Sequence, residues 1–195
     1  MNVSSSTPAD AARACPVWVE SMGGPLVVVP LSALAAWGGC TQTGMVVGDA
    51  TAVGDYDRAG AVDGLAGAIA VGEGGAQALV LADEPATSCC LPGRRAFLRW
   101  LAADGEAQLR AAAELVLADP ATAWEECGAW VTDGPAVLMD SVEAGTELGV
   151  EYPGGGRPAR APVPLPAGRW RVRAVHTKTD EGPWVGLVHL LPADT

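Results

Sequence analysis

Glycine and proline interrupt this chain so often that its apolar runs are all short. The 195 residues include 25 Gly and 15 Pro, scattered between apolar segments rather than gathered in one block. This spacing is typical of many short strands joined by turns. Apolar residues make up 49% of the chain and charged residues 18%, a balance that supports a folded core. We therefore predict an α+β fold that is predominantly antiparallel β.

The apolar runs and their periodicity predict the individual elements. Strands are expected over residues 17–19, 26–29, 66–71, 77–82, 124–131, 134–140, 146–152, 169–177 and 184–191. Residues 96–102 are consistent with a strand or the start of a helix. Loops are expected over 40–64, 83–93 and 153–162, although 83–93 could also be irregular extended chain.

One main helix is predicted near residues 104–118. Asp104 is a suitable N-cap, Leu109, Ala113 and Val116 form an apolar stripe, and Asp119-Pro120 ends the periodic segment. A short helix is also expected over 31–37, beginning at Pro30 and ending at Gly38-Gly39.

The length of the chain allows one large domain or two small ones. We predict a single compact unit over 1–195, with residues 1–14 flexible because they are rich in Ser, Thr and Ala. An alternative division separates an α+β part, 15–118, from a β-rich part, 119–195. The C-terminal part is expected to form a β-sheet or sandwich.

The chain is acidic, and the charge is unevenly distributed. Its formal net charge is −11, with eight acids and no base over 119–156 but six bases and three acids over 157–195. Nucleic-acid binding requires the opposite balance, because basic side chains neutralise phosphate. An acidic surface favours solubility, and it also attracts a basic protein partner.

The cysteines and the apolar runs indicate a reduced, cytoplasmic protein. The five cysteines are odd in number and form no disulfide or zinc-binding pattern. No signal-peptide pattern opens the chain, and no apolar run is long enough to span a bilayer. We expect free thiols and no membrane association.

Two Gly-rich segments resemble ligand-binding motifs but lack essential parts. GEGG, residues 72–75, follows an apolar strand as a dinucleotide loop would, but another strand follows it instead of a helix. It is better explained as a hairpin turn. Asp55, Asp57 and Asp63 lie in a loop that begins like a calcium site, but the third and last ligand positions are not acidic. We predict no metal and no cofactor.

An enzyme would need convergent acid and base groups, and the chain offers few. His176 and His189 lie on the last two predicted strands, with no nucleophile or orienting group marked beside them. A pocket that brings Asp55, Asp57 and His176 together is the alternative catalytic arrangement. Ordinary sheet histidines explain the pattern more simply, so no catalytic residues are predicted.

Seven tryptophans, against one Phe and two Tyr, are many for this length. Most should lie in the core, but exposed Trp residues often anchor protein interfaces. The base-free acidic stretch contains two of them beside several carboxylates. The predicted partner-contact residues are Trp124, Glu125, Glu126, Trp130, Asp133 and Asp140.

Five strings occur in an order and at distances that resemble the immunity protein 21 family of bacterial polymorphic toxin systems. They read WVESMGGPLVVVP, DYDRAGAV, ALVLADEP followed by LP, FLRWLAAD and DGPAVLMDS. The resemblance covers about residues 17–191. It implies a small cytosolic antidote that binds a cognate toxin and blocks it, without cofactor or catalytic residues.

Together these features predict an immunity protein that neutralises its toxin through an acidic surface. If the toxin is a nuclease with a basic active site, this charge would speed their association. The alternatives are a small-molecule-binding regulatory domain, which would require an apolar pocket, and an unfamiliar enzyme that uses the Asp/His pocket.

Overall fold

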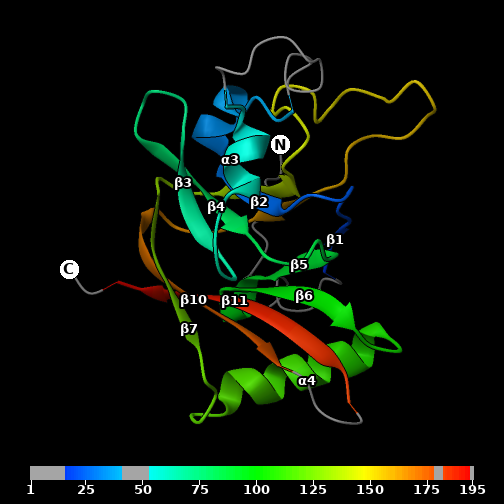
Figure 1. Cartoon of the computed structure of the whole chain (residues 1–195), viewed down its shortest axis with the longest axis vertical. Coiled ribbons are helices and arrows are strands. Elements are labelled where there is room, and N and C mark those ends of the chain that lie inside the picture. The colour runs from blue at the N-terminus through cyan, green and yellow to red at the C-terminus, as the bar shows by residue number, and fades with distance from the viewer. Residues whose placement is uncertain (1–15, 41–52, 178–181, 194–195) are drawn as a thin grey trace, which may run out of the picture.

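Two antiparallel β-sheets form the centre of the protein (Figure 1). The computed structural model describes residues 16–40, 53–177 and 182–193. The α+β prediction with predominant antiparallel β-structure and one main helix is confirmed. The predicted flexibility of residues 1–14 lies outside the described residues.

The elements follow the chain in short segments. The strands are β1 Trp18–Val19, β2 Leu26–Pro30, β3 Gly67–Val71, β4 Ala76–Leu81, β5 Ser88–Leu91, β6 Ala96–Ala102, β7 Glu125–Thr132, β8 Ala136–Asp140, β9 Arg160–Val163, β10 Gly168–Thr177 and β11 Trp184–Pro192. The α-helices are α3 Asp55–Gly60 and α4 Glu106–Ala118, and the 3-10 helices are η1 Leu31–Ala36 and η2 Pro92–Arg94.

Each sheet combines strands from before and after residue 118. The six-stranded sheet has the order β1-β5-β6-β11-β10-β7, and the five-stranded sheet has the order β3-β4-β2-β8-β9. All the pairs are antiparallel. The central strands of both sheets therefore pair with partners that are distant in sequence.

Strand β2 shows how the sheets are buried on both faces. All five of its residues are buried. Leu26 and Val28 belong to the cluster between the two sheets, which we call the inner core, together with Phe97 and Val172. Val27 and Val29 point the other way and pack in a second cluster with Trp37. Because successive side chains alternate between faces, four consecutive apolar residues fit a strand that is covered on both sides.

Helices cover the outer faces of the two sheets. Ala33 of η1 and Ala59 of α3 are buried in the cluster on the outer face of the five-stranded sheet. Leu109 and Ala113 of α4 pack on the outer face of the six-stranded sheet with Leu187. Figure 1 shows the resulting order of layers, from α3 at the top through the two sheets to α4 at the bottom. The protein is a β-sandwich with a helix on each side.

The hairpin and the long strands agree with the sequence prediction. β3 and β4 pair across a turn that contains GEGG, as predicted. Residues 96–102 form a strand rather than a helix start. The main helix is present, but its N-cap is Gly105 and not Asp104. Glu106 in its first turn complements the positive end of the helix dipole.

Four local predictions are wrong or incomplete. Residues 146–152 form turns instead of a strand, and Val150 points outward there. β9 lies in the segment predicted as a loop; Pro162 is compatible with a strand because β9 is at the edge of its sheet. Cys89 and Cys90 lie in strand β5, and α3 forms inside the turn-rich segment 40–64.

One glycine allows two large side chains to meet across the six-stranded sheet. Gly186 of β11 lies between Arg99 of β6 and His176 of β10 in the strand register. A Cβ atom at this position would lie 2.9 Å from Cβ of Arg99 and 3.3 Å from the His176 ring. The missing side chain therefore provides the space for both neighbours.

We expect Gly186→Ala to lower the free energy of unfolding by about 1–3 kcal/mol, because the added methyl group overpacks this position. Gly74→Ala is the control, since a Cβ at position 74 in the hairpin turn meets nothing within 4 Å. It should change stability by less than about 0.5 kcal/mol. Urea denaturation measures the free energy of unfolding of both variants, and equal values would contradict the predicted overpacking at position 186.

Candidate functional site

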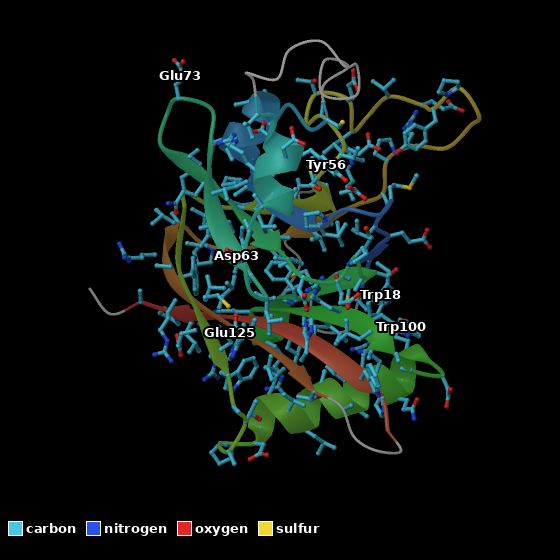
Figure 2. All side chains as sticks on the ribbon, viewed as in Figure 1. Trp18, Tyr56, Asp63, Glu73, Trp100 and Glu125 are labelled. Atoms are coloured by element: carbon cyan, nitrogen blue, oxygen red, sulfur yellow. The ribbon has the colours of Figure 1, made fainter. Side chains whose placement is uncertain are left out.

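The acidic segment of the chain forms an edge of the six-stranded sheet. Glu125 and Glu126 open strand β7, and both are exposed. Gly128 has φ +83°, and the register with β10 shifts nearby, which marks a β-bulge. Glu125 Oε1 accepts a hydrogen bond from the backbone N–H of Leu65 at 3.2 Å. Figure 2 shows Asp63 and Glu125 on the same side of the molecule.

The neighbouring strand β10 brings basic side chains to this edge. Arg171 Nη2 lies 3.0 Å from Glu126 Oε1, and both side chains are about half exposed. Arg173 occupies the register position opposite Glu126. The stretch that is free of bases in the sequence is therefore partly neutralised in the folded protein.

Trp124 packs at the start of β7 against a cation and an imidazole. Arg173 lies over its ring, 4.3 Å from the centroid, and the ring of His189 is 5.6 Å away. Arg173 also donates from Nε to Nδ1 of His189 at 3.3 Å. Burial, followed by the charge of Arg173, lowers the pKa of His189 to about 4. His189 is therefore neutral at neutral pH and accepts this hydrogen bond.

Two of the predicted contact residues are buried. Trp130 is 0% exposed, lies opposite Trp170 in the strand register, and donates from its indole to the carbonyl oxygen of Gln77 at 3.0 Å. Asp140 is 3% exposed and accepts hydrogen bonds from the backbone N–H groups of Met22 and Val142. The side chains of Trp130 and Asp140 therefore have structural roles, because both form buried or partly buried hydrogen bonds to the backbone. Asp133, in contrast, is exposed in the turn between β7 and β8.

The alternative catalytic residues make separate contacts. Asp55 accepts from the backbone N–H of Gly38 and pairs with Arg58, while Asp57 accepts from the backbone N–H of Gly54 at the start of α3. His176 lies on β10 of the six-stranded sheet. The structure brings the two aspartates together on α3, which packs on the other sheet, but shows no contact of either with His176.

His176 instead lines a cavity of about 380 Å³ at one end of the sandwich. The loop after β4 contributes Asp83 and Glu84, and the ends of β6 and β11 contribute Trp100 and Trp184. Nδ1 of His176 is 3.4 Å from Oδ2 of Asp83. Burial, followed by the charge of Arg99, lowers the pKa of His176.

The sequence prediction did not select the acids or the tryptophans of this cavity. They come from segments far apart in the chain, and the sequence predicts only a loop or irregular extended chain over residues 83–93. The available signal is the pair Asp83-Glu84, which directly follows the apolar strand ALVLA. Adjacent acids at the end of a buried strand mark the rim of a sheet, but they do not reveal which aromatic rings lie beside it.

Cys89, Cys90 and Cys127 have little thiolate character, because burial raises the pKa of each thiol. Cys40, Cys89, Cys90 and Cys127 are free, and burial raises the pKa of both Cys89 and Cys90 to about 12. The described part of the chain contains no cluster of three or more His, Cys, Asp or Glu that could hold a metal. None of the described helices is long and apolar enough to cross a membrane.

These features define a helix-covered β-sandwich with a mixed-charge sheet edge and an aromatic, acid-rimmed cavity. The comparison with protein families identifies it further. The model of the family described as Immunity protein 21 matches residues 17–183, and the chain belongs to this family. The resemblance stated from the sequence is thereby confirmed. No curated protein and no solved structure matches the chain.

We expect Asp140→Ala to lower the free energy of unfolding by about 2–3 kcal/mol, because it leaves two backbone N–H groups without their charged acceptor. Asp133→Ala removes the same kind of side chain from an exposed turn. It should change stability by less than about 0.5 kcal/mol. Thermal or urea denaturation distinguishes the two, and a tolerated Asp140→Ala would contradict the structural role.

The low pKa of His189 predicts a loss of stability at mildly acidic pH. An unfolded histidine titrates near 6.5, whereas folded His189 titrates at about 4, so the unfolded chain binds the extra proton. The contribution of neutral His189 to the free energy of unfolding is fully present above pH 6.5. It is lost as the pH falls toward 4, which lowers the free energy of unfolding by roughly 2 kcal/mol after solvent screening. His189→Gln, which does not titrate, should flatten this part of a stability-against-pH curve. An unchanged slope would contradict the assignment.

Proposed function

We propose that this protein is an immunity protein that binds a cognate bacterial toxin and neutralises it by covering the toxin's active surface. Membership of the Immunity protein 21 family carries the proposal. The net charge of −11 supports an acidic surface and a basic toxin. Inhibition is by binding alone, with no catalytic step and no cofactor, and it takes place in the cytoplasm.

The exposed edge of β7 is the proposed contact surface. Glu125 and Glu126 open the strand, Asp133 follows it, and Trp124 lies partly exposed beside them. We call these four residues the β7 surface. Trp130 and Asp140 are omitted because both are buried. A carboxylate cluster beside a tryptophan combines long-range attraction with an anchor that loses water on contact.

The arginines of β10 modify the electrostatics of this surface. The exposed pair Arg171–Glu126 contributes little to stability, because both side chains are about half exposed to solvent. A basic side chain of the toxin can displace Arg171 and form an ion pair with Glu126 in its place. The net acidity of the whole molecule accelerates the encounter with the toxin, and the β7 surface determines the orientation of the two proteins on contact.

Charge reversal tests the proposal. The variant carries Glu125→Lys, Glu126→Lys and Asp133→Lys, and the partner is the toxin domain encoded by the neighbouring gene. We expect the association rate to fall by about tenfold or more at low salt, because steering depends on local charge. Surface plasmon resonance at several salt concentrations measures the rate, and cell survival on co-expression measures protection.

The matched control reverses three exposed acids elsewhere, Glu20→Lys, Glu147→Lys and Glu151→Lys. Both variants change the net charge equally, so only the location of the charges differs. Equal losses would show that only the overall charge matters and would reject the β7 surface. Failure of the unmodified protein to bind or protect would reject the proposed function itself.

A further inference from the structure

The cavity at the end of the sandwich combines two kinds of wall. Trp100 lies on β6, and Trp184 lies on the neighbouring strand β11. In the strand register Trp100 is opposite Val185, and Trp184 is opposite Ala102. Asp83 and Glu84 come from the loop after β4, and both are exposed. Its volume of about 380 Å³ lies within the range of ligand-binding sites and suits one long side chain.

A buried arginine holds the acidic loop in place. Arg99 is 1% exposed, and its guanidinium donates to the carbonyl oxygens of Ala82 and Glu84. The backbone of Asp83, between them, has φ +71°, a left-handed conformation that Asp and Asn tolerate better than most residues. Nη1 and Nη2 of Arg99 bind the backbone, whereas Oδ2 of Asp83 lies 3.4 Å from Nδ1 of His176.

Among the described residues, the groups around the cavity leave it acidic. Arg99 is the basic side chain beneath the loop, and burial lowers its pKa to about 10, at which it is still charged at neutral pH. His176 is neutral there, because burial lowers its pKa below the ordinary value. Two exposed carboxylates therefore oppose one buried guanidinium, and they lie nearer to the opening.

The tryptophans also have defined positions. The rings of Trp100 and Trp18 meet edge to face, with centroids 5.4 Å apart, and the indole of Trp100 donates to the carbonyl oxygen of Ala103. Figure 2 shows Trp18 and Trp100 together on the side of the molecule away from Glu125. Trp184 is 42% exposed. Both indoles line the cavity and give it an aromatic wall.

We propose that this cavity binds an arginine side chain of the toxin. A guanidinium stacks on indole faces and forms paired hydrogen bonds with carboxylates, and its aliphatic stem fits beside Leu101 and Pro85. The inference rests on the proposed function, and it adds a second contact point that is separate from the β7 surface. The cavity acts as an anchor pocket, in which one buried cation fixes the register of the complex.

The first experiment titrates the isolated protein with N-acetyl-arginine methylamide. We expect saturable shifts of the indole N–H signals of Trp100 and Trp184 in NMR spectra, with a dissociation constant on the order of millimolar. The signals are assigned with Trp100→Phe and Trp184→Phe. The citrulline analogue has the same shape without the charge and should cause no saturable shift. Equal binding of the two compounds, or preference for the lysine analogue, would overturn the assignment to arginine.

The second experiment measures toxin affinity with the double variant Asp83→Asn, Glu84→Gln. Asn tolerates the left-handed backbone at position 83, so the fold should be retained, and thermal denaturation checks this. We expect the dissociation constant to rise by about tenfold or more, because a buried charged partner loses its counter-charges. The control Glu147→Gln, Glu151→Gln changes the net charge equally and should leave the affinity within about twofold.

The outcomes separate the two proposals. If the double variant binds the toxin as tightly as the unmodified protein does, the anchor pocket is rejected while the proposed function stands. If the unmodified protein does not bind the toxin at all, the proposed function and the toxin assignment of the pocket both fail. In that case the arginine titration alone decides whether the cavity binds this chemical group.

Discussion

Burial of β2 on both faces is the constraint on which the rest of the structure depends. A strand with apolar side chains on both sides cannot form the surface of a simple two-layer sandwich, because one face would be exposed to water. The five-stranded sheet must therefore pack on the other sheet through Leu26 and Val28 and on helices through Val27 and Val29. The helices η1 and α3 are short, but they satisfy this requirement by placing Trp37 and Ala59 over the sheet.

The elements that the sequence predicts well are those stabilised by local interactions. The β3–β4 hairpin is determined by its own turn, and α4 by its periodic Leu109 and Ala113. Elements that depend on distant partners are harder to predict. β9 contains Pro162 and follows a segment rich in glycine and proline, and it becomes a strand only because β8 pairs with it. Residues 146–152 alternate like a strand but have no partner strand among the described residues, so they form turns around buried Leu148.

The candidate site shows the same division. Sequence reasoning identified the acidic segment and the exposed residues Glu125, Glu126 and Asp133. It could not foresee that β10 would place Arg171 and Arg173 beside them, because strand order is set by the whole fold. It also could not tell that Trp130 faces the inner core or that Asp140 binds the backbone of Met22. The cavity could not be predicted from the sequence, because four separate segments form it.

The way Arg99 holds the loop after β4 has a consequence for sequence variation. Its guanidinium binds main-chain carbonyl groups, which every residue has, so the loop geometry does not depend on the side chains that the loop carries. Position 84 can accept almost any residue without loss of this anchor. Position 83 is restricted by its positive φ chiefly to Asp, Asn and Gly. The chemistry of this rim can thus change while the β-sandwich beneath it stays the same.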